Sequence, residues 1–485
     1  MEESKIVQYI FAFSAKERDK FVQFVQSPIF NQHEKTIELL NIIVKQANRK
    51  YVKLEKKSVY DQLFPNKKYQ EQKIHNLLAN LKKLLHRFYA ISYLDENPLM
   101  GELMTIETAF KRKQFDLLKN RSKQLQKHLS ARTSQDDTYY YVNYRMNNML
   151  GYYSSTYVNR SKSTSLQTMM NHLDRYYILE KLKNSCHLYA HHLLMNAKYD
   201  WSLLDDIVQY LQDHKEEFKS DNSIHLYYTI LMSLRSTEDN YYYLKLKELL
   251  VEKVDQFSQL EKEDLYNFTN NYCILQINRG KSAYQEELFE LYQQGLESEV
   301  IFQNDILTEW NYKNIVTLGA KLKRFDWTER FINEHKDKLP ASQRENAYKY
   351  NLANLYYTKG KYQEVLSNLL HVQYTDVKYH LSSSFLLLRT YYKLEDTEAM
   401  LGLIDTFRIY VLRNNQMTSD QKKGYINFLK LVKKLVLLKH QYHAFSKSEV
   451  RQKLAALREK VLSTENVINR SWLVEECGEP SAVAS

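Results

Sequence analysis

Metal-ligating side chains cluster at one place in the sequence. The stretch Cys186-His187-Leu-Tyr-Ala-His191-His192 holds one thiol and three imidazoles. On a helix, His187 and His191 lie one turn apart on one face, a spacing that holds zinc in metalloproteases. The glutamate that such sites place between the two histidines is missing, and the neighbouring leucines favour a packed helix. We expect no metal site here and no cofactor.

Motifs for catalysis are also missing from the sequence. It contains no serine nucleophile elbow, no Walker loop, no kinase motif and no paired carboxylates at a catalytic spacing. With nine glycines and five prolines in 485 residues, there is little room for Gly-rich phosphate loops or β-hairpins. We therefore expect a non-enzymatic protein without catalytic residues.

Positive charge is concentrated towards the N-terminus. Residues 1–135 hold 25 Lys and Arg against 14 Asp and Glu, whereas residues 136–485 hold 44 of each. Such asymmetry is typical of a protein with an acidic partner, such as nucleic acid, an acidic protein or an anionic membrane surface. It is equally typical of a region that is only well solvated.

One predicted helix in this basic region has two distinct faces. Its apolar stripe consists of Ile74, Leu77, Leu78, Leu81, Leu84, Leu85 and Phe88. The opposite stripe consists of Lys73, Asn76, Asn80, Lys83 and Arg87. Since Lys and Arg bind phosphates and Asn binds base edges, the polar stripe is a candidate nucleic-acid-binding surface. An ordinary solvated helix face has the same composition.

Cysteine usage and hydropathy indicate the compartment. Cys186, Cys273 and Cys477 are far apart, and an odd, sparse count is typical of a reducing cytoplasm. The N-terminus lacks the pattern of a signal peptide, and no run of about 18 uncharged apolar residues could span a membrane. We expect a cytoplasmic protein that does not bind membranes.

Tyrosine is frequent, with 40 residues, and it is dense between Tyr139 and Tyr157. Tyrosines fill gaps between helices while keeping a hydroxyl at the rim. Exposed aromatic rings near positive charge can also stack on the bases of single-stranded nucleic acid. The sequence leaves both interpretations open.

Helical periodicity runs through nearly the whole chain and predicts an all-α fold. Ser14–Glu17 and Ser446–Glu449 have the spacing of capping boxes, each predicting the start of a helix. In the C-terminal half, small or apolar markers recur at Gly319, Ala353 and Leu388. A period of about 34 residues is that of the tetratricopeptide repeat, a helix–turn–helix unit.

The best-formed unit surrounds Ala353, where Leu352, Tyr356, Gly360 and Tyr362 match the repeat consensus. Val365 departs from that consensus. The third unit has Glu395 and Thr397 where glycine and an aromatic residue are usual, so its turn is not predicted from sequence.

Six short motifs carry a wider resemblance: Gln26-Ser-Pro-Ile-Phe-Asn31, Leu63-Phe-Pro65, Asn314-Ile-Val-Thr-Leu-Gly319, Asp326-Trp327, the segment Asn346 to Tyr357, and Ser471-Trp472-Leu473. Through them the chain resembles an uncharacterised family of bacterial all-helical proteins with tetratricopeptide-like C-terminal halves. The resemblance implies the fold and a bacterial origin, and it brings no known activity.

In tetratricopeptide arrays, inward-facing residues of the first helices contact an extended peptide or a helix. The corresponding positions here are Lys323, Tyr350, Asn354, Tyr357, Phe385, Arg389, Tyr392 and Lys393. Aromatic anchors beside cations suit a peptide that carries a carboxylate or an acidic segment. The alternative is that the tyrosines only pack neighbouring helices.

We expect four regions. Residues 1–98 form a basic helical region, 99–260 a middle region of four or five helices, 261–470 the repeats with a capping helix, and 471–485 a disordered tail. The predicted function is a scaffold or adaptor that binds a peptide or protein in the concave groove of a tetratricopeptide-like solenoid. The alternative is a nucleic-acid-binding regulator acting through the basic N-terminal region.

Overall fold

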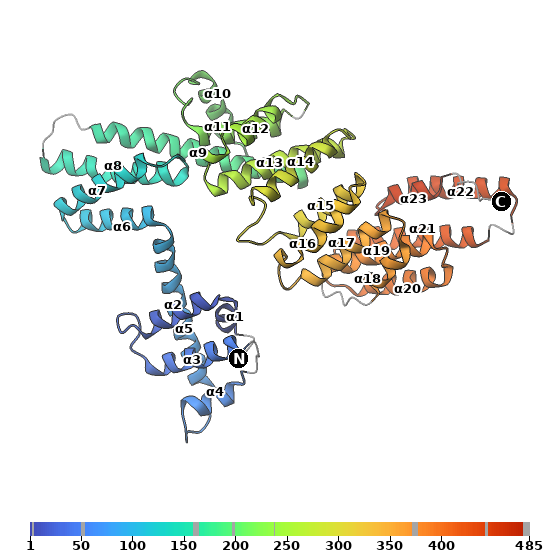
Figure 1. Ribbon diagram of the computed structural model, residues 1–485, viewed down its shortest axis with the longest axis horizontal. Coiled ribbons are helices and arrows are strands. Elements are labelled where there is room, and N and C mark those ends of the chain that lie inside the picture. Colours follow the sequence, from blue (N-terminus) through green and yellow to red (C-terminus); the bar gives the residue numbers. More distant parts are fainter. Residues whose placement is uncertain are drawn as a thin grey trace. The chain divides into compact units, whose positions relative to one another are not determined.

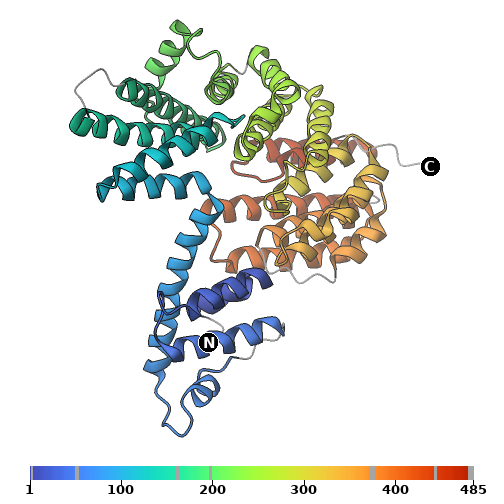
Figure 2. The same ribbon diagram turned by 60° about the vertical axis from the view of Figure 1, so that its left-hand side comes forward.

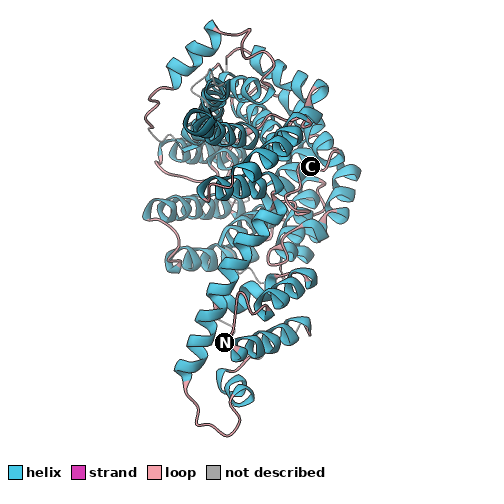
Figure 3. Ribbon diagram, turned by 90° about the vertical axis from the view of Figure 1, so that its left-hand side faces the viewer, coloured by secondary structure: helices cyan, strands magenta, loops and turns pink. Residues whose placement is uncertain are grey.

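Helices make up the fold of this protein. The computed structural model describes residue 1 and residues 4–49, 54–158, 164–195, 199–236, 238–370, 377–441 and 445–478. No strand occurs in these ranges (Figure 3), apart from an isolated bridge between Gln303 and Ile306. The expectation of an all-α fold is confirmed. No helix of the described part is both long and apolar enough to cross a membrane.

Two compact units divide the chain. Unit 1 comprises residues 1–187 and 199–225, and unit 2 comprises residues 188–198 and 226–485. The helices of unit 1 are α1 (Lys5–Ala12), α2 (Ala15–Gln26), α3 (Glu34–Asn48), α4 (Lys56–Leu63), α5 (Glu71–Glu96), α6 (Pro98–Lys111), α7 (Phe115–Ser130), α8 (Asp137–Tyr153), the short π-helix η1 (Ser154–Val158) and α10 (Leu204–Asp213). Two helices contribute to both units, α9 (Thr164–Met195) and α11 (Asn222–Arg235).

Unit 2 contains the remaining helices. They are α12 (Tyr241–Glu252), η2 (Val254–Gln256), α13 (Gln259–Asn278), α14 (Tyr284–Glu297), α15 (Glu309–Lys321), α16 (Phe325–Glu334), η3 (Lys336–Lys338), α17 (Arg344–Thr358), α18 (Tyr362–Leu369), α19 (Val377–Lys393), α20 (Thr397–Arg413), α21 (Ser419–His440), α22 (Lys447–Ser463) and α23 (Arg470–Glu476).

Helix α5 gathers the N-terminal helices of unit 1. All seven apolar residues of its predicted stripe are buried, and α1, α2, α3 and α4 each contact it. Figure 2 shows these shorter helices against the long light-blue α5. Both predicted capping boxes are confirmed, since Ser14 and Ser446 accept from the backbone N–H three residues on and bind the glutamate found there. Capping and periodicity are local signals, which is why the sequence carries them reliably.

The middle region is more divided than expected. Residues 98–260 hold seven α-helices, α6 to α12, in place of four or five. The missed breaks lie between α6 and α7 and between α11 and α12, where the sequence has neither glycine nor proline. At the first of them Lys113 adopts a left-handed conformation, with φ 57°. Such a turn lacks the residue types that mark breaks in a sequence.

Helix pairs follow one another in unit 2. The pairs α15–α16, α17–α18 and α19–α20 are each packed together, and the first helices α15, α17 and α19 contact one another in succession (Figure 1). Gly319 allows the close approach within its pair, because a methyl group there would overlap the hydroxyl of Thr328 on α16. Ala353 and Leu388, the other two markers, are fully buried.

The same type of backbone turn joins the two helices in each of five helix pairs. At the end of the first helix, one N–H donates to the carbonyl five residues earlier, and the preceding N–H donates to the carbonyl three residues before it. In α17 these bonds are Lys361 N to Tyr356 O at 2.9 Å and Gly360 N to Tyr357 O at 3.0 Å. The same pair of bonds ends α6, α13, α15 and α19. The residue with positive φ in each turn is Lys113, Gly280, Lys323, Gly360 or Glu395.

The tail prediction is wrong for residues 471–476. They form helix α23, in which Trp472 and Leu473 are buried against the C-terminal core of unit 2. The apolar pair supplies enough buried surface to order a short helix, a contribution that composition alone did not reveal. Residues 479–485 lie outside the described part of the chain.

The turn after α19 predicts a stabilising substitution. Glu395 has φ 58°, a conformation that costs a residue with a Cβ roughly 1–2 kcal/mol, while glycine costs about 0.5–1 kcal/mol in unfolded-chain entropy. We expect Glu395→Gly to raise the Tm of unit 2 by about 1–3 °C, whereas Gly360→Ala lowers it by a similar amount. Differential scanning calorimetry measures both.

Glu395→Ala is the matched control. It removes the ion pair with Lys439, at 3.0 Å, but keeps the Cβ atom. If Glu395→Ala raised the Tm as much as Glu395→Gly does, the backbone explanation would be wrong.

Candidate functional site

The expected partner-binding residues lie mainly on α17 and α19, where three of them meet. The guanidinium carbon of Arg389 lies 4.5 Å from the ring centroid of Tyr357 and 5.6 Å from that of Phe385. Tyr357 is on α17, and the other two residues are one turn apart on α19. The cation therefore lies between the aromatic rings of two successive first helices.

Arg389 is only partly exposed and has no anionic partner in the described part of the chain. Its Nε is buried and donates no hydrogen bond to any described residue. A cation withdrawn from water is stabilised when an anion or an acceptor reaches it. Cation–π attraction to the two rings supplies part of this stabilisation. The remaining donors are available to the carboxylate of a ligand.

Asn354 lies beside this cation on the same helix as Tyr357. It is three residues earlier, hence on the same face of α17. The Asn354 amide is half-buried and forms no hydrogen bond with the described residues. Burial raises the pKa of the Tyr357 phenol, which keeps it protonated as a donor. The Arg389 guanidinium also hydrogen-bonds the Tyr357 phenol, so the Asn354 amide and the remaining guanidinium donors are the groups available to a ligand on this stretch of surface.

Tyr350 extends the same face towards α15, but it is a packing residue. Its ring is 9% exposed, lies 5.8 Å from the ring of Tyr379 and is covered by the ammonium of Lys313 at 5.3 Å. Burial also raises the pKa of the Tyr350 phenol. Among the described residues, Lys323 forms no ion pair, hydrogen bond or ring contact with these side chains, and it sits in the exposed turn after α15.

Helix α23 covers the other end of the expected groove. Trp472 packs edge-on against Phe385 and Tyr392, with ring centroids 6.1 and 5.5 Å apart. Lys393 donates to Glu476 at 2.7 Å. Burial alone would lower the pKa of Lys393, but the hydrogen bond and charge of Glu476 outweigh it and raise the pKa. Tyr392 and Lys393 therefore have partners within the chain, and sequence reasoning missed them because Trp472 and Glu476 are 80 residues away.

The predicted nucleic-acid stripe on α5 is engaged by the protein itself. Lys73 lies over the ring of Phe64 at 5.4 Å and Arg87 over that of Phe30 at 5.1 Å. Asn80 donates to the hydroxyl of Thr36 on α3 at 3.0 Å, and Asn76 accepts from Gln72. Of the five residues, Lys83 is the one that is exposed without such a contact among the described residues. The stripe remains a prediction.

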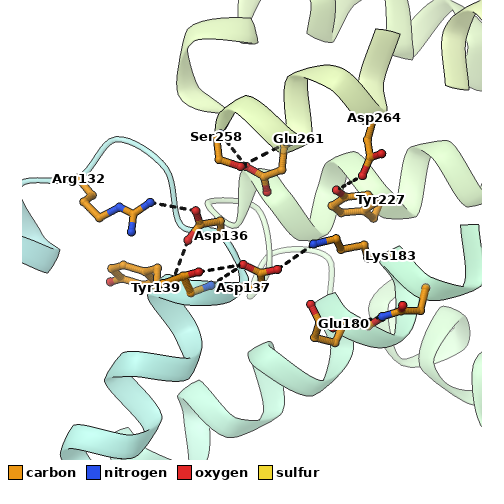
Figure 4. A network of polar contacts seen from close by, with 12 residues as sticks. Arg132, Asp136, Asp137, Tyr139, Glu180, Lys183, Tyr227, Ser258, Glu261 and Asp264 are labelled. Atoms are coloured by element: carbon orange, nitrogen blue, oxygen red, sulfur yellow. Dashed lines mark hydrogen bonds and ion pairs between the residues drawn. The ribbon is translucent and has the colours of Figure 1, made fainter. Parts of the chain in front are cut away.

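A dense group of acids and bases lies at the start of α8 in unit 1 (Figure 4). Arg132 donates to Asp136 at 2.9 Å, and Asp136 caps α8 by accepting from the backbone N–H of Tyr139. Lys183 of α9 donates to Asp137 at 2.8 Å. Burial, together with the nearby charge of Asp137, raises the pKa of Glu180. Asp136 and Asp137 are thus paired with bases, and the Asp137–Lys183 pair links α8 to α9.

Asp221 is the centre of a second part of this network. It is 4% exposed, accepts from the Tyr140 hydroxyl at 2.6 Å and accepts from the Arg175 Nε at 3.1 Å. His172 lies against the rings of Tyr139 and Tyr140, and its Nδ1 is buried without a partner among the described residues. Burial, with the charge of Arg175, lowers the pKa of His172 to about 4. The imidazole is neutral at pH 7.

In unit 2, Figure 4 also shows the Tyr227 hydroxyl donating to Asp264, at 2.6 Å. Elsewhere in this unit the Tyr243 hydroxyl lies 3.2 Å from Cys273 Sγ and donates to Glu287 at 2.5 Å. Burial raises the pKa of Cys273 to about 11, so the thiol is protonated and a poor nucleophile. These contacts are between packed helices and form a structural network.

No group of three or more His, Cys, Asp or Glu side chains among the described residues is placed to hold a metal ion. Comparison of the chain with protein-family models, curated proteins and solved structures gives no match. The bacterial all-helical family and the repeat type therefore stay predictions. A function has to be inferred from the contacts of Arg389 and of the other groups described above.

The state of His172 predicts a loss of stability in acid. Because the folded state binds the proton with a pKa of about 4 and the unfolded chain near 6.5, unfolding takes up a proton between these pH values. The free energy of unfolding then falls by at most about 1.4 kcal/mol per pH unit over that window as the pH drops. In His172→Gln this contribution is absent, so the Tm difference between wild type and variant shrinks from pH 6.5 to pH 4.

His128→Gln provides the matched control, because His128 is exposed on α7. Its pH profile should follow that of the wild type. If the Tm difference between the wild type and His172→Gln stayed constant from pH 6.5 to pH 4, His172 would not be held neutral in the folded protein.

Proposed function

We propose that the protein is a non-enzymatic cytoplasmic scaffold or adaptor that binds a peptide or protein segment on the face formed by α17 and α19. The single observation that carries the proposal is Arg389, a half-buried cation between two aromatic rings that lacks an anionic partner in the described chain. Residues with this combination of packing and unused charge are typical of binding hot spots.

The succession of helix pairs supports a tetratricopeptide-like arrangement for α15 to α20. Each pair turns through the same backbone bonds, and the first helices contact one another in sequence. In such arrays the first helices line the concave surface, which is where Asn354, Tyr357 and Arg389 would then lie. A ligand bound there lies across successive repeats.

The chemistry of the three residues specifies the ligand. Arg389 offers a planar donor pair that fits a carboxylate, either of an acidic side chain or of a chain terminus. Asn354 offers both a donor and an acceptor to a peptide group. The ring of Tyr357 gives an apolar surface for a neighbouring side chain. We therefore infer a peptide ligand with at least one carboxylate at the contact.

Selection from a displayed peptide library, followed by isothermal titration calorimetry, tests this function. The Kd of the selected peptide should rise about tenfold or more in Arg389→Gln, because a hydrogen bond to a charged group contributes roughly 1.5–3 kcal/mol. Asn354→Ala should weaken binding less, and amidation of the peptide's carboxylate should weaken the wild type as much as Arg389→Gln does.

Arg330→Gln is the matched control, since Arg330 is exposed on α16 and makes no ion pair with a described residue. It should leave the Kd unchanged. Selected peptides that bind the Asn354→Ala/Arg389→Gln protein as tightly as the wild type would place the binding surface elsewhere.

A further inference from the structure

Most of the net positive charge of the N-terminal quarter comes from one short segment. Residues 108–135 hold eight Lys and Arg against a single acidic residue, Asp116. This segment alone contributes a net +7 of the +11 carried by the whole chain. It spans the end of α6, the turn, α7 and the loop before α8, all within unit 1. The positive charge is therefore concentrated on one helix pair.

Most of these cations have no carboxylate partner among the described residues. Arg121 pairs with Glu102 and Arg132 with Asp136, so these two stabilise the fold. Lys119 lies 3.9 Å from Asp116, at the limit of an ion pair. The cations that are exposed and form no ion pair with a described residue are Lys111, Arg112, Lys113, Lys123 and Lys127.

The exposed cations of this segment, Lys119 included, form a strip along the end of α6, the turn and α7. Lys111 is the last residue of α6, and Arg112 and Lys113 lie in the turn between α6 and α7, which are packed side by side with α8 (Figure 1). Lys119, Lys123 and Lys127 follow at intervals of four residues, about 6 Å apart along one face of α7. Like charges at this spacing destabilise a helix. An anionic ligand that runs along α7 would relieve this repulsion.

Aromatic rings adjoin the strip at the start of α7. Phe115 lies 4.7 Å from Tyr153 and 4.6 Å from Tyr157, measured between ring centroids. The ammonium of Lys119 lies 5.1 Å from the Tyr153 centroid. Tyr152 is 54% exposed and Tyr157 is 49% exposed, so half of each side chain faces solvent. These tyrosines pack against the helix pair and still present surface to a ligand.

We propose that this surface, formed by the α6–α7 turn, the lysine face of α7 and the tyrosines at the end of α8 and in η1, binds single-stranded nucleic acid. The lysines and Arg112 contact the phosphates, and Tyr152 and Tyr157 stack on unpaired bases. This is a second activity, carried by unit 1, and it does not rest on peptide binding by unit 2.

The aromatic rings distinguish the single strand from other polyanions. In a duplex the bases are stacked on one another, so exposed tyrosines gain no partner there. A helix that lies in an anionic membrane surface needs several apolar side chains beside its cations. The exposed face of α7 has one large apolar residue, Leu117.

Fluorescence anisotropy with the full-length protein tests the proposal. The probes are an oligothymidylate of about 30 nucleotides, a duplex of equal length, and vesicles of phosphatidylcholine with a minority of phosphatidylserine. We expect tighter binding to the oligothymidylate than to the duplex or the vesicles. Between about 50 and 200 mM salt, the slope of log K against log salt is negative, and it should become less negative by roughly 1.4 in Lys123→Gln/Lys127→Gln, because two phosphate contacts are lost.

Two matched comparisons make the test specific. Lys67→Gln/Lys68→Gln removes two exposed lysines from the turn before α5 and should leave the slope unchanged. Tyr157→Leu keeps apolar packing against Phe115 but removes the stacking ring, and should weaken binding about fivefold or more, whereas Tyr157→Phe retains it. Tighter binding to duplex or vesicles, equal slopes for both lysine variants, or equal affinity of the Leu and Phe variants would overturn the proposal.

Discussion

A pair of backbone hydrogen bonds at the end of the first helix is the constraint on which the helix pairs of this protein depend. The bonds reverse the chain, and in four of the five pairs three residues separate the two helices, so that the next helix begins beside the last turn of the first. They use only N–H and carbonyl groups, and the geometry is therefore the same whether the left-handed residue is Gly360, Lys323 or Glu395. The charged residues cost stability there, but the packing of two helices outweighs a cost of about 1–2 kcal/mol.

Because these turns do not depend on side-chain type, some elements of the fold can be predicted from the sequence and others cannot. Helix class, the capping boxes and the buried stripe of α5 follow from local residue types and periodicity, and the structure confirms them. Turns at Lys113 and Glu395 could not be predicted, because their left-handed residues are not glycine. The order of residues 471–476 could not be predicted either, since Trp472 is buried by rings that are distant in sequence. The contacts of Arg389 depend on two helices whose alignment no local pattern specifies.

Charge satisfaction separates structural polar groups from those available for binding. Asp221 accepts from both Tyr140 and Arg175, and such mutual pairing leaves little capacity for a ligand. Arg389, Lys123 and Lys127 lack carboxylate partners among the described residues, so their charges are balanced only by solvent, rings or a ligand. The two surfaces differ in kind. One half-buried guanidinium favours a single carboxylate, whereas a strip of exposed ammonium groups favours a chain of regularly spaced anions.

Helix α23 limits the proposed peptide-binding face at its C-terminal end. Its Trp472 covers Tyr392, and its Glu476 neutralises Lys393, so a ligand on α19 cannot use either residue without displacing the helix. Displacement would expose a buried indole and leave the C-terminal core open, at a cost of several kcal/mol. A ligand held by a few contacts cannot offset that cost, so the proposed ligand would bind with α23 in place. The free part of the proposed face then ends at Arg389, the last cation without an anionic partner among the described residues, where the carboxylate of the ligand would bind.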